Sequence, residues 1–144
     1  MFFSKKSIYN IYLNFFTLKG KKSVAKKNID RSLFLVSQQI KIPVFLVLYF
    51  YITKLNIIVE TKKVSTRKRT FFVPFPVGPR RRIFLALKWL KKGVFLNRSK
   101  IQLGDKLAFE LMRVICSKPC HVSIFKRNNF LKVTQNRSYL YYRW

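Results

Sequence analysis

Acidic residues are scarce in this chain. Its 144 residues contain 4 Asp+Glu against 31 Lys+Arg, a formal net charge of +27 with a sequence pI near 10.8. Repulsion of this size is usually tolerated because a partner neutralises it, which points to nucleic acid or an anionic membrane. Asp30, Glu60, Asp105 and Glu110 are scattered, and each has Lys or Arg within four positions. We therefore expect local charge pairs rather than a catalytic pair of carboxylates.

Metal-ligating residues are also few, with two cysteines and one histidine in the stretch CSKPCH. Cys116, Cys120 and His121 suggest zinc, but no second ligand pair exists and neighbouring Cys and His rarely ligate together. We expect two reduced thiols at a helix end and no metal. Gly20 lies in LKGKKS, which lacks the first glycine of a phosphate loop, so it is interpreted as a basic turn. These absences predict a chain that is not an enzyme and needs no cofactor.

Long hydrophobic runs are missing as well. The apolar run IPVFLVLYFYI at 42–52 lies between Lys41 and Lys54, whereas a spanning helix needs about 20 apolar residues. A buried helix is expected, with a membrane-surface protein anchored by this run as an alternative. The amino-terminal MFFSKKSIYNIYLNFF has no small-residue cleavage site, so it shows no clear secretory signal.

Apolar and aromatic residues, in contrast, are plentiful, at 49% and 17% of the chain. This composition excludes a disordered basic tail and permits a core of ordinary size. We expect one folded domain over residues 1–144. Heavy use of Lys, Phe, Tyr, Ile and Asn is typical of an A+T-rich gene, which favours an organellar genome.

Apolar spacing predicts a mainly α fold of about six helices. The expected helices are 8–18, 23–37, 43–51, 83–92 with an entry at Pro79 and a stop at Gly93, 102–116, and a last helix capped by Asn128 or Asn129.

Two strands, 57–64 and 70–77, are expected to flank a turn at 65–69, because their residues are largely β-branched or aromatic. Pro74 and Pro76 each remove a ladder donor, which forbids a central strand. The sequence therefore predicts a single helical domain with one protruding two-stranded β-hairpin at about 57–77, free of other elements.

Basic residues gather on this ribbon and on the helix after it. Ribbon charges suit contact with phosphates, although a solvated edge that blocks aggregation is the alternative. The helix places Ile83 and Leu87 on an apolar face and Lys88 on another, while the arginines of its first turn need a compensating polyanion. Basic residues among aromatic rings suit RNA, because rings and guanidinium planes stack on unpaired bases.

The segments GKKS, VExK, TxxVPxxVxPxRR, LAxKW, KLAFEL and NRSYLYYRW follow one another along the chain. In this order they resemble the seventh small-subunit ribosomal protein family of bacteria and organelles. The resemblance implies a structural protein that binds the 3′ major (head) domain of small-subunit rRNA and nucleates head assembly. It also implies neighbouring head and platform proteins, and a ribbon directed at exit-site tRNA and mRNA.

The family motifs match this sequence at the GKKS turn, the ribbon, the following helix and the closing segment. The family commonly has two glycines at the ribbon tip, where this chain has Arg67 and Lys68. The expected RNA-binding residues are Lys21, Lys22, Ser23, Lys62, Lys63, Arg67, Lys68, Arg69, Arg80, Arg81, Arg82, Lys88, Trp89, Lys92, Arg137, Tyr142, Arg143 and Trp144.

A chain that stops just after tyrosine, arginine and tryptophan looks more like mitochondrial members of the family. We therefore expect an organelle-encoded protein of the small subunit of the mitochondrial ribosome, in the matrix, with a plastid as the alternative. Two other functions stay open: a free, basic RNA-maturation factor and the membrane-surface protein.

Overall fold

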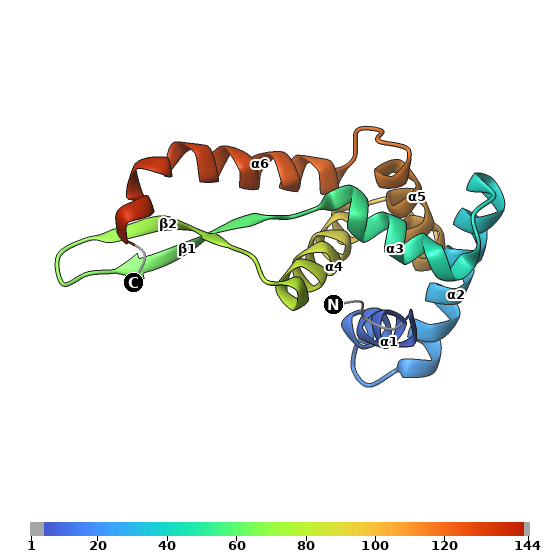
Figure 1. Ribbon diagram of the computed structural model, residues 1–144. Helices are drawn as coiled ribbons and strands as arrows, with labels where there is room; N and C mark the ends of the chain where they lie inside the picture. The colour runs from blue at the N-terminus through green and yellow to red at the C-terminus, as the bar shows by residue number, and fades with distance from the viewer. Residues whose placement is uncertain (1–4, 143–144) are drawn as a thin grey trace.

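The computed structural model describes residues 5–142, with side chains from residue 8 onward. Helices gather at one end of the molecule, and a two-stranded ribbon extends from them with the last long helix beside it (Figure 1). In chain order the elements are α1 (Lys5–Phe16), α2 (Lys22–Ile40), α3 (Val44–Leu55), β1 (Val59–Ser65), β2 (Thr70–Pro76), α4 (Pro79–Leu96), α5 (Leu103–Ile115), α6 (His121–Gln135) and the 3₁₀ helix η1 (Arg137–Tyr142). The predicted mainly helical fold with one antiparallel hairpin is confirmed.

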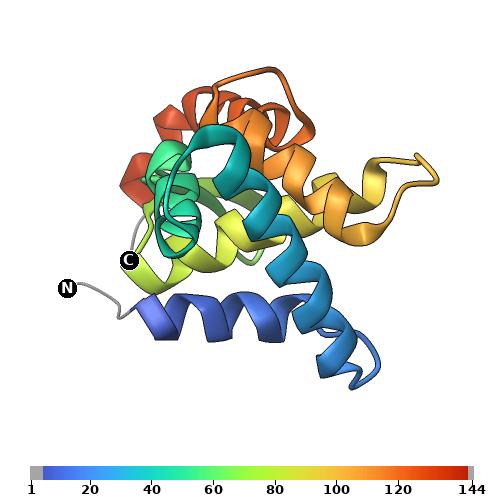
Figure 2. The same cartoon turned by 90° about the vertical axis from the view of Figure 1, so that its right-hand side faces the viewer.

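The core lies chiefly among α1 to α5 (Figure 2), and Val122 at the start of α6 joins it. Ile29, Leu87 and Leu111 are fully buried there, as the periodicity of their helices predicts. The buried Tyr51 hydroxyl donates to the Ala86 carbonyl at 2.9 Å, so burial leaves this polar group satisfied. The result is a packed helical body from which the ribbon extends.

Gly104 allows α5 to approach α2 closely. A Cβ at this position would lie 3.0 Å from the Asn28 carbonyl oxygen and 3.3 Å from the Arg31 Cδ. One residue further on, Asp105 accepts from the Arg31 Nε at 2.9 Å. The absence of a side chain at Gly104 thus lets the two backbones pack and brings this ion pair together.

The predicted stop at Gly93 is wrong, because α4 continues to Leu96. Gly93 is buried, and a Cβ there would lie 3.3 Å from the Val122 Cγ2. Its lack of a side chain serves the contact between α4 and α6 rather than the end of a helix.

The predicted cap at Asn128 or Asn129 is also wrong, since both lie inside α6. The N-cap is Cys120, whose Sγ accepts from the Ser123 amide at 3.4 Å, while the Ser123 Oγ accepts from the Cys120 amide at 3.1 Å. Cysteine is not among the usual capping residues, so the sequence carried no standard signal for this start.

Replacing the two thiols tests this assignment. Cys120→Ala is expected to lower the free energy of unfolding by about 0.5–2 kcal/mol through loss of the cap, whereas Cys120→Ser keeps an oxygen acceptor and stays close to wild type. The exposed Cys116 provides the control, because Cys116→Ala should change stability by less than about 0.5 kcal/mol. Urea unfolding measures both, and stoichiometric zinc lost from the double serine variant would contradict the prediction of ordinary thiols.

The expectation of a buried helix at 42–52 is only half right. Val47, Leu48 and Tyr51 are buried, but Phe45 and Tyr49 are about half exposed on the opposite face of α3. Among the described residues no single helix is long and apolar enough to cross a membrane, and one pair bent by 84°, α2 with α3, passes on length and composition alone.

The acids do not form the local pairs expected of them. Glu60 pairs with Arg81 and Asp105 with Arg31, each between separate elements. Glu110 is buried, and desolvation raises the pKa of its carboxyl although His121 and Arg113 oppose that rise. The partners of Glu60 and Asp105 are therefore set by tertiary packing and not by sequence proximity.

The ribbon pairs Val59 with Pro76 at its base and Ser65 with Thr70 next to the turn. It is not free, contrary to the prediction. The Asn129 Nδ2 donates to the Val59 carbonyl at 2.9 Å, which ties α6 to β1. Nearer the turn, η1 returns to β2, so each strand of the ribbon contacts a carboxy-terminal element (Figure 1).

Candidate nucleic-acid interface

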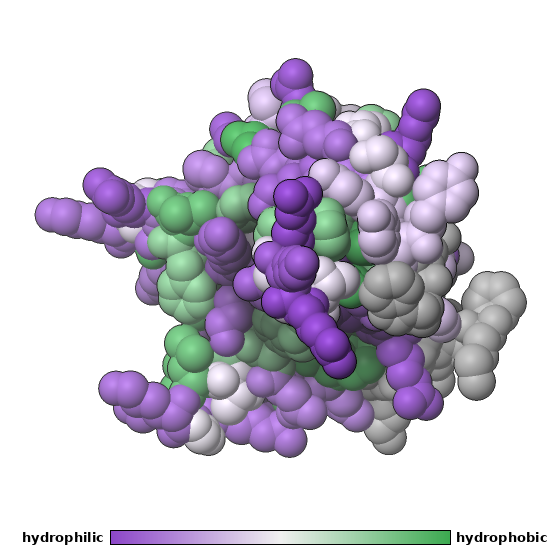
Figure 3. Space-filling view, turned by 90° about the vertical axis from the view of Figure 1, so that its left-hand side faces the viewer, coloured by the Kyte–Doolittle hydropathy of each residue, from purple (hydrophilic) through white to green (hydrophobic). Residues whose placement is uncertain are grey.

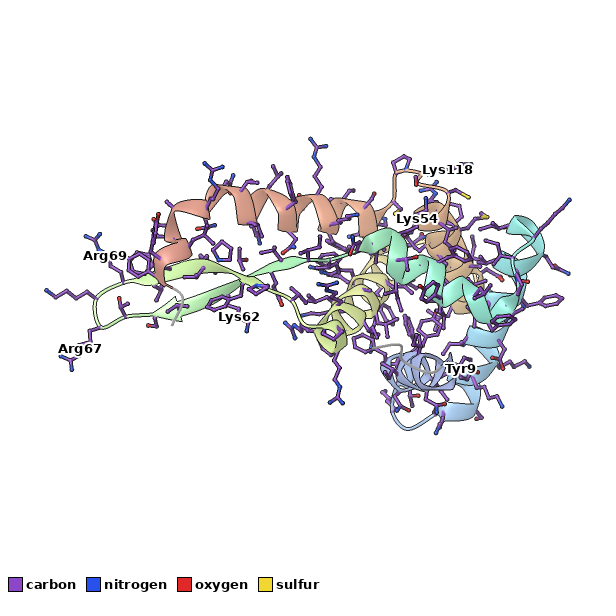
Figure 4. The ribbon with its side chains drawn as sticks, viewed as in Figure 1. Tyr9, Lys54, Lys62, Arg67, Arg69 and Lys118 are labelled. Atoms are coloured by element: carbon purple, nitrogen blue, oxygen red, sulfur yellow. The ribbon has the colours of Figure 1, made fainter. Side chains whose placement is uncertain are left out.

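The ribbon tip holds three cations away from the helical body. Arg67 and Arg69 point outward from the turn in Figure 4, and hydrophilic side chains cover this end in Figure 3. The Thr66 amide and hydroxyl both donate to the Arg69 carbonyl at 2.8 Å, and the Arg69 amide donates to the Thr66 Oγ1 at 3.2 Å. Neither Arg67 nor Lys68 has a positive φ, the conformation that favours glycine. The turn therefore forms without the two glycines that are common at this place in the family that the motifs resemble.

The two lysines of β1 lie on opposite faces of the ribbon, since neighbouring residues of a strand alternate. Both are exposed, and the Lys62 Nζ lies 5.1 Å from the centre of the Phe75 ring. Phe72, opposite Lys63, is also about half exposed. Ammonium groups and aromatic rings therefore stand side by side, an arrangement that suits phosphates and unpaired bases.

The three arginines at the start of α4 differ in whether they contact the base of the ribbon. The Arg81 Nε and Nη2 donate to the two oxygens of Glu60 at 3.0 and 2.8 Å, and these hydrogen bonds raise the pKa of Arg81. The Arg82 Nε donates to the Val77 carbonyl at 3.1 Å. Arg80 is exposed at the first turn. Arg81 and Arg82 thus also position the ribbon base on α4, a role that the sequence pattern did not indicate.

Further along α4 the predicted residues face different neighbours. Lys88 is exposed, and the Lys92 Nζ lies 5.0 Å from the centre of the Phe125 ring of α6. Trp89 is partly buried and lines a cavity with residues of β1 and α6. Lys91, outside the predicted set, donates to the Phe15 carbonyl at 2.9 Å and joins α4 to α1.

The remaining predicted residues lie at the two ends of the described chain. Lys21 is the N-cap of α2, and Lys22 and Ser23 lie in its first turn. All three are exposed, and Gly20 just before them takes a φ of 74°. Arg137 and Tyr142 belong to η1, and the Tyr142 ring stacks on Phe71 with centroids 5.0 Å apart. Arg143 and Trp144 lie outside the described residues.

The predicted cations therefore do not form one patch. Those within the described residues occupy the ribbon, the length of α4, η1 and the start of α2. Lys54, Lys118 and Lys126 line a cleft that the sequence pattern did not single out. Lys54 is far along the chain from Lys118 and Lys126, so no local pattern predicted this cleft. Within residues 5–142, no group of three or more His, Cys, Asp or Glu side chains could hold a metal ion.

Known proteins resemble this chain along most of its length. The family model described as ribosomal protein S7p/S5e matches residues 3–137. The chain belongs to this family. Small ribosomal subunit protein uS7 of Pelobacter propionicus is 33% identical over 92% of this chain and 83% of that protein. The uS7 proteins of Geotalea uraniireducens and Thermomicrobium roseum are 31% and 30% identical, over 92% of this chain and 83% and 84% of theirs.

Membership confirms the resemblance drawn from the motifs. The family is structural and non-enzymatic, which agrees with the scattered acids and confirms that the chain is not an enzyme. These three relatives are bacterial, so they do not test whether this chain belongs to a mitochondrial or a plastid ribosome.

Arg80 and Arg81 form a matched pair for testing the start of α4. Arg80→Gln should lower the slope of log affinity against log salt for rRNA by about 0.7–0.9, one phosphate contact, and leave stability within about 0.5 kcal/mol. Arg81→Gln should reduce that slope less, because Glu60 already neutralises this guanidinium, and should lower the free energy of unfolding by up to about 1 kcal/mol. Salt-dependent filter binding and urea unfolding separate the two, and identical behaviour of both variants would contradict the division of roles.

Proposed function

We propose that this chain is a structural constituent of the small ribosomal subunit that acts as one RNA-binding unit over residues 1–144. Family membership carries the proposal, and the uS7 proteins it resembles are named as small-subunit components. The charge of +27 supplies the attraction to rRNA phosphates. The tip residues Arg67, Lys68 and Arg69 support it physically, because a ribbon braced by α6 and η1 holds them at a fixed distance from the body.

The contact surface that we propose comprises three regions. The body contributes the turn before α2 and the exposed face of α4, the ribbon contributes both faces of β1 and its tip, and the carboxy-terminal segment contributes η1 and the residues after it. Its members are Lys21, Lys22, Ser23, Lys62, Lys63, Arg67, Lys68, Arg69, Arg80, Arg81, Arg82, Lys88, Trp89, Lys92, Arg137, Tyr142, Arg143 and Trp144.

Finer details of the role belong to the same proposal. The chain binds the head domain of the rRNA, nucleates its assembly among neighbouring head and platform proteins, and directs the ribbon tip at exit-site tRNA and mRNA. Its composition favours an organelle-encoded protein of a mitochondrial ribosome, with the plastid as the other location.

The deciding experiment combines binding and sedimentation. The purified chain should bind a transcript of the head domain more tightly than a transcript of another rRNA domain of equal length, at the same salt. A tagged chain should sediment with intact small subunits of the organelle in moderate salt. Equal affinity for both transcripts, release from mature subunits as expected of a maturation factor, or flotation with lipid would each overturn the proposal.

A further inference from the structure

Two hollows lie next to each other along α6, between this helix and the chain that leads from α3 into β1. The first, of about 400 Å³, is lined by Lys54, Ser117, Lys118, Ser123 and Lys126 together with apolar side chains. The second, of about 250 Å³, is lined chiefly by Asn56, Ile57, Trp89, Lys126, Asn129 and Phe130. Lys126 lines both, so the two hollows lie on either side of its side chain, and we call the pair the α6 groove.

The first hollow has the chemistry of a phosphate site. Three lysine side chains and two serines converge on it from α3, from the loop between α5 and α6, and from α6 itself. Lys54 and Lys118 lie near each other at the body end of α6 in Figure 4. No Asp or Glu is among its described lining residues. The Ser123 hydroxyl already donates to the Cys120 carbonyl at 2.8 Å. The three ammonium groups and the Ser117 hydroxyl therefore supply the donors, and they match a phosphate in both charge and hydrogen bonding.

The second hollow has the chemistry of a nucleobase site. Trp89 and Phe130 supply aromatic surface, and Asn56 and Asn129 supply carboxamides of the kind that pair with base edges. At about 250 Å³ it is smaller than sites for drug-sized ligands, which begin at roughly 300 Å³. Its walls suit one planar ring system.

Two hydrogen bonds hold the groove in shape. The Lys126 Nζ donates to the Lys54 carbonyl at 3.2 Å, across the boundary between the hollows. The Asn129 Nδ2 donates to the Val59 carbonyl at 2.9 Å at the other end of the second hollow. α6 is therefore joined to the α3–β1 segment at two points, and such preorganisation lowers the ordering cost of binding.

We propose that the α6 groove binds one unpaired nucleotide of RNA, with its phosphate among Lys54, Lys118 and Lys126 and its base on Trp89 and Phe130. This inference rests on the proposed rRNA-binding function and adds to it a site for a single splayed-out base, separate from the ribbon tip. Charge complementarity selects RNA as the occupant, because apolar walls next to three lysines fit a base joined to a phosphate.

Trp89 provides the readout. The chain has two tryptophans, so Trp144→Phe leaves Trp89 as the sole indole fluorophore. The probe is hexa-adenylate, compared with an abasic oligonucleotide of the same number of phosphates. Hexa-adenylate should quench Trp89 emission and the abasic probe should not, since only a base can stack on the ring. Equal quenching by both probes, or none by either, would overturn the proposal.

Matched substitutions on exposed positions test the two hollows separately. Phe130→Ala and Lys118→Gln should each weaken hexa-adenylate binding. For Phe130→Ala the dissociation constant should rise by about fivefold or more, since fivefold corresponds to the smallest contribution measured for one stacked base. Leu131→Ala and Lys132→Gln are the controls, because both residues are exposed on α6 and line neither hollow. They should stay within about twofold of the parent.

The outcomes distinguish this inference from the proposed function. If the head-domain transcript still binds selectively but Phe130→Ala and Leu131→Ala behave alike, the groove is not a base site and only this inference falls. Loss confined to Lys118→Gln would reduce the groove to a phosphate contact and would also overturn it. If the transcript shows no selectivity, the proposed function itself falls.

Discussion

Replacing Lys62, Lys63, Arg67, Lys68 and Arg69 together by glutamine is expected to lower the slope of log affinity against log salt for rRNA by about 3.5–4.5, at roughly 0.7–0.9 per phosphate contact. All five side chains are exposed on the ribbon. Their removal should leave the fold intact, because the ribbon is held by β pairing, by α6 and by η1 rather than by these charges. Filter binding across a salt series measures the slope, and circular dichroism checks the fold.

A charge-matched variant provides the control for this prediction. Lys26, Lys27, Lys41, Lys100 and Lys132 are exposed outside the proposed surface, and replacing these five by glutamine gives the same net charge. The control should keep most of the salt dependence if the ribbon makes the contacts. Equal loss in both variants would mean that overall charge, not ribbon position, determines binding.

Gly104→Val is expected to lower the free energy of unfolding by about 1–3 kcal/mol. A Cβ at this position lies 3.0 Å from the Asn28 carbonyl oxygen, and backbone cannot rotate away as a flexible side chain can. Helix propensity alone predicts the opposite sign, because valine is a better helix former than glycine. Urea unfolding followed by circular dichroism therefore decides between packing and propensity.

Gly78 supplies the control for that substitution. A Cβ there meets nothing within 4 Å, and Gly78 is the N-cap of α4, a position that serine favours. Gly78→Ser should change the free energy of unfolding by less than about 0.5 kcal/mol. A Gly104→Val midpoint equal to wild type would show that α2 and α5 separate at little cost, and that this close approach does not hold the body together.

Local pattern was enough to predict the ribbon. The expected strands 57–64 and 70–77 agree with β1 and β2 to within two residues at each end, because β-branched and aromatic residues flank a polar turn. The prolines at positions 74 and 76 indicated that no further strand pairs with theirs. Both lie on β2, which pairs only with β1. The helix periodicity likewise identified α1 to α5, with ends shifted by up to four residues.

The start of α6 shows where local pattern failed. Helix boundaries depend on which group satisfies the first free amides, and in α6 a buried thiol and a serine share that task. Gly93 failed for a related reason. In sequence, a glycine that ends a helix cannot be distinguished from a glycine that lets two helices cross closely. The contact of Gly93 with Val122 shows that it has the second role.

By itself, the sequence determined the charge, the apolar spacing of the helices, the hairpin and the motifs that place the chain in its ribosomal protein family. These depend on residues close together along the chain. Tertiary structure alone decided that Glu60 pairs with Arg81, that α6 and η1 cover the ribbon, and that Lys54, Lys118 and Lys126 meet in one groove. Such contacts join residues far apart in sequence, and their partners are set by how the whole helical body packs.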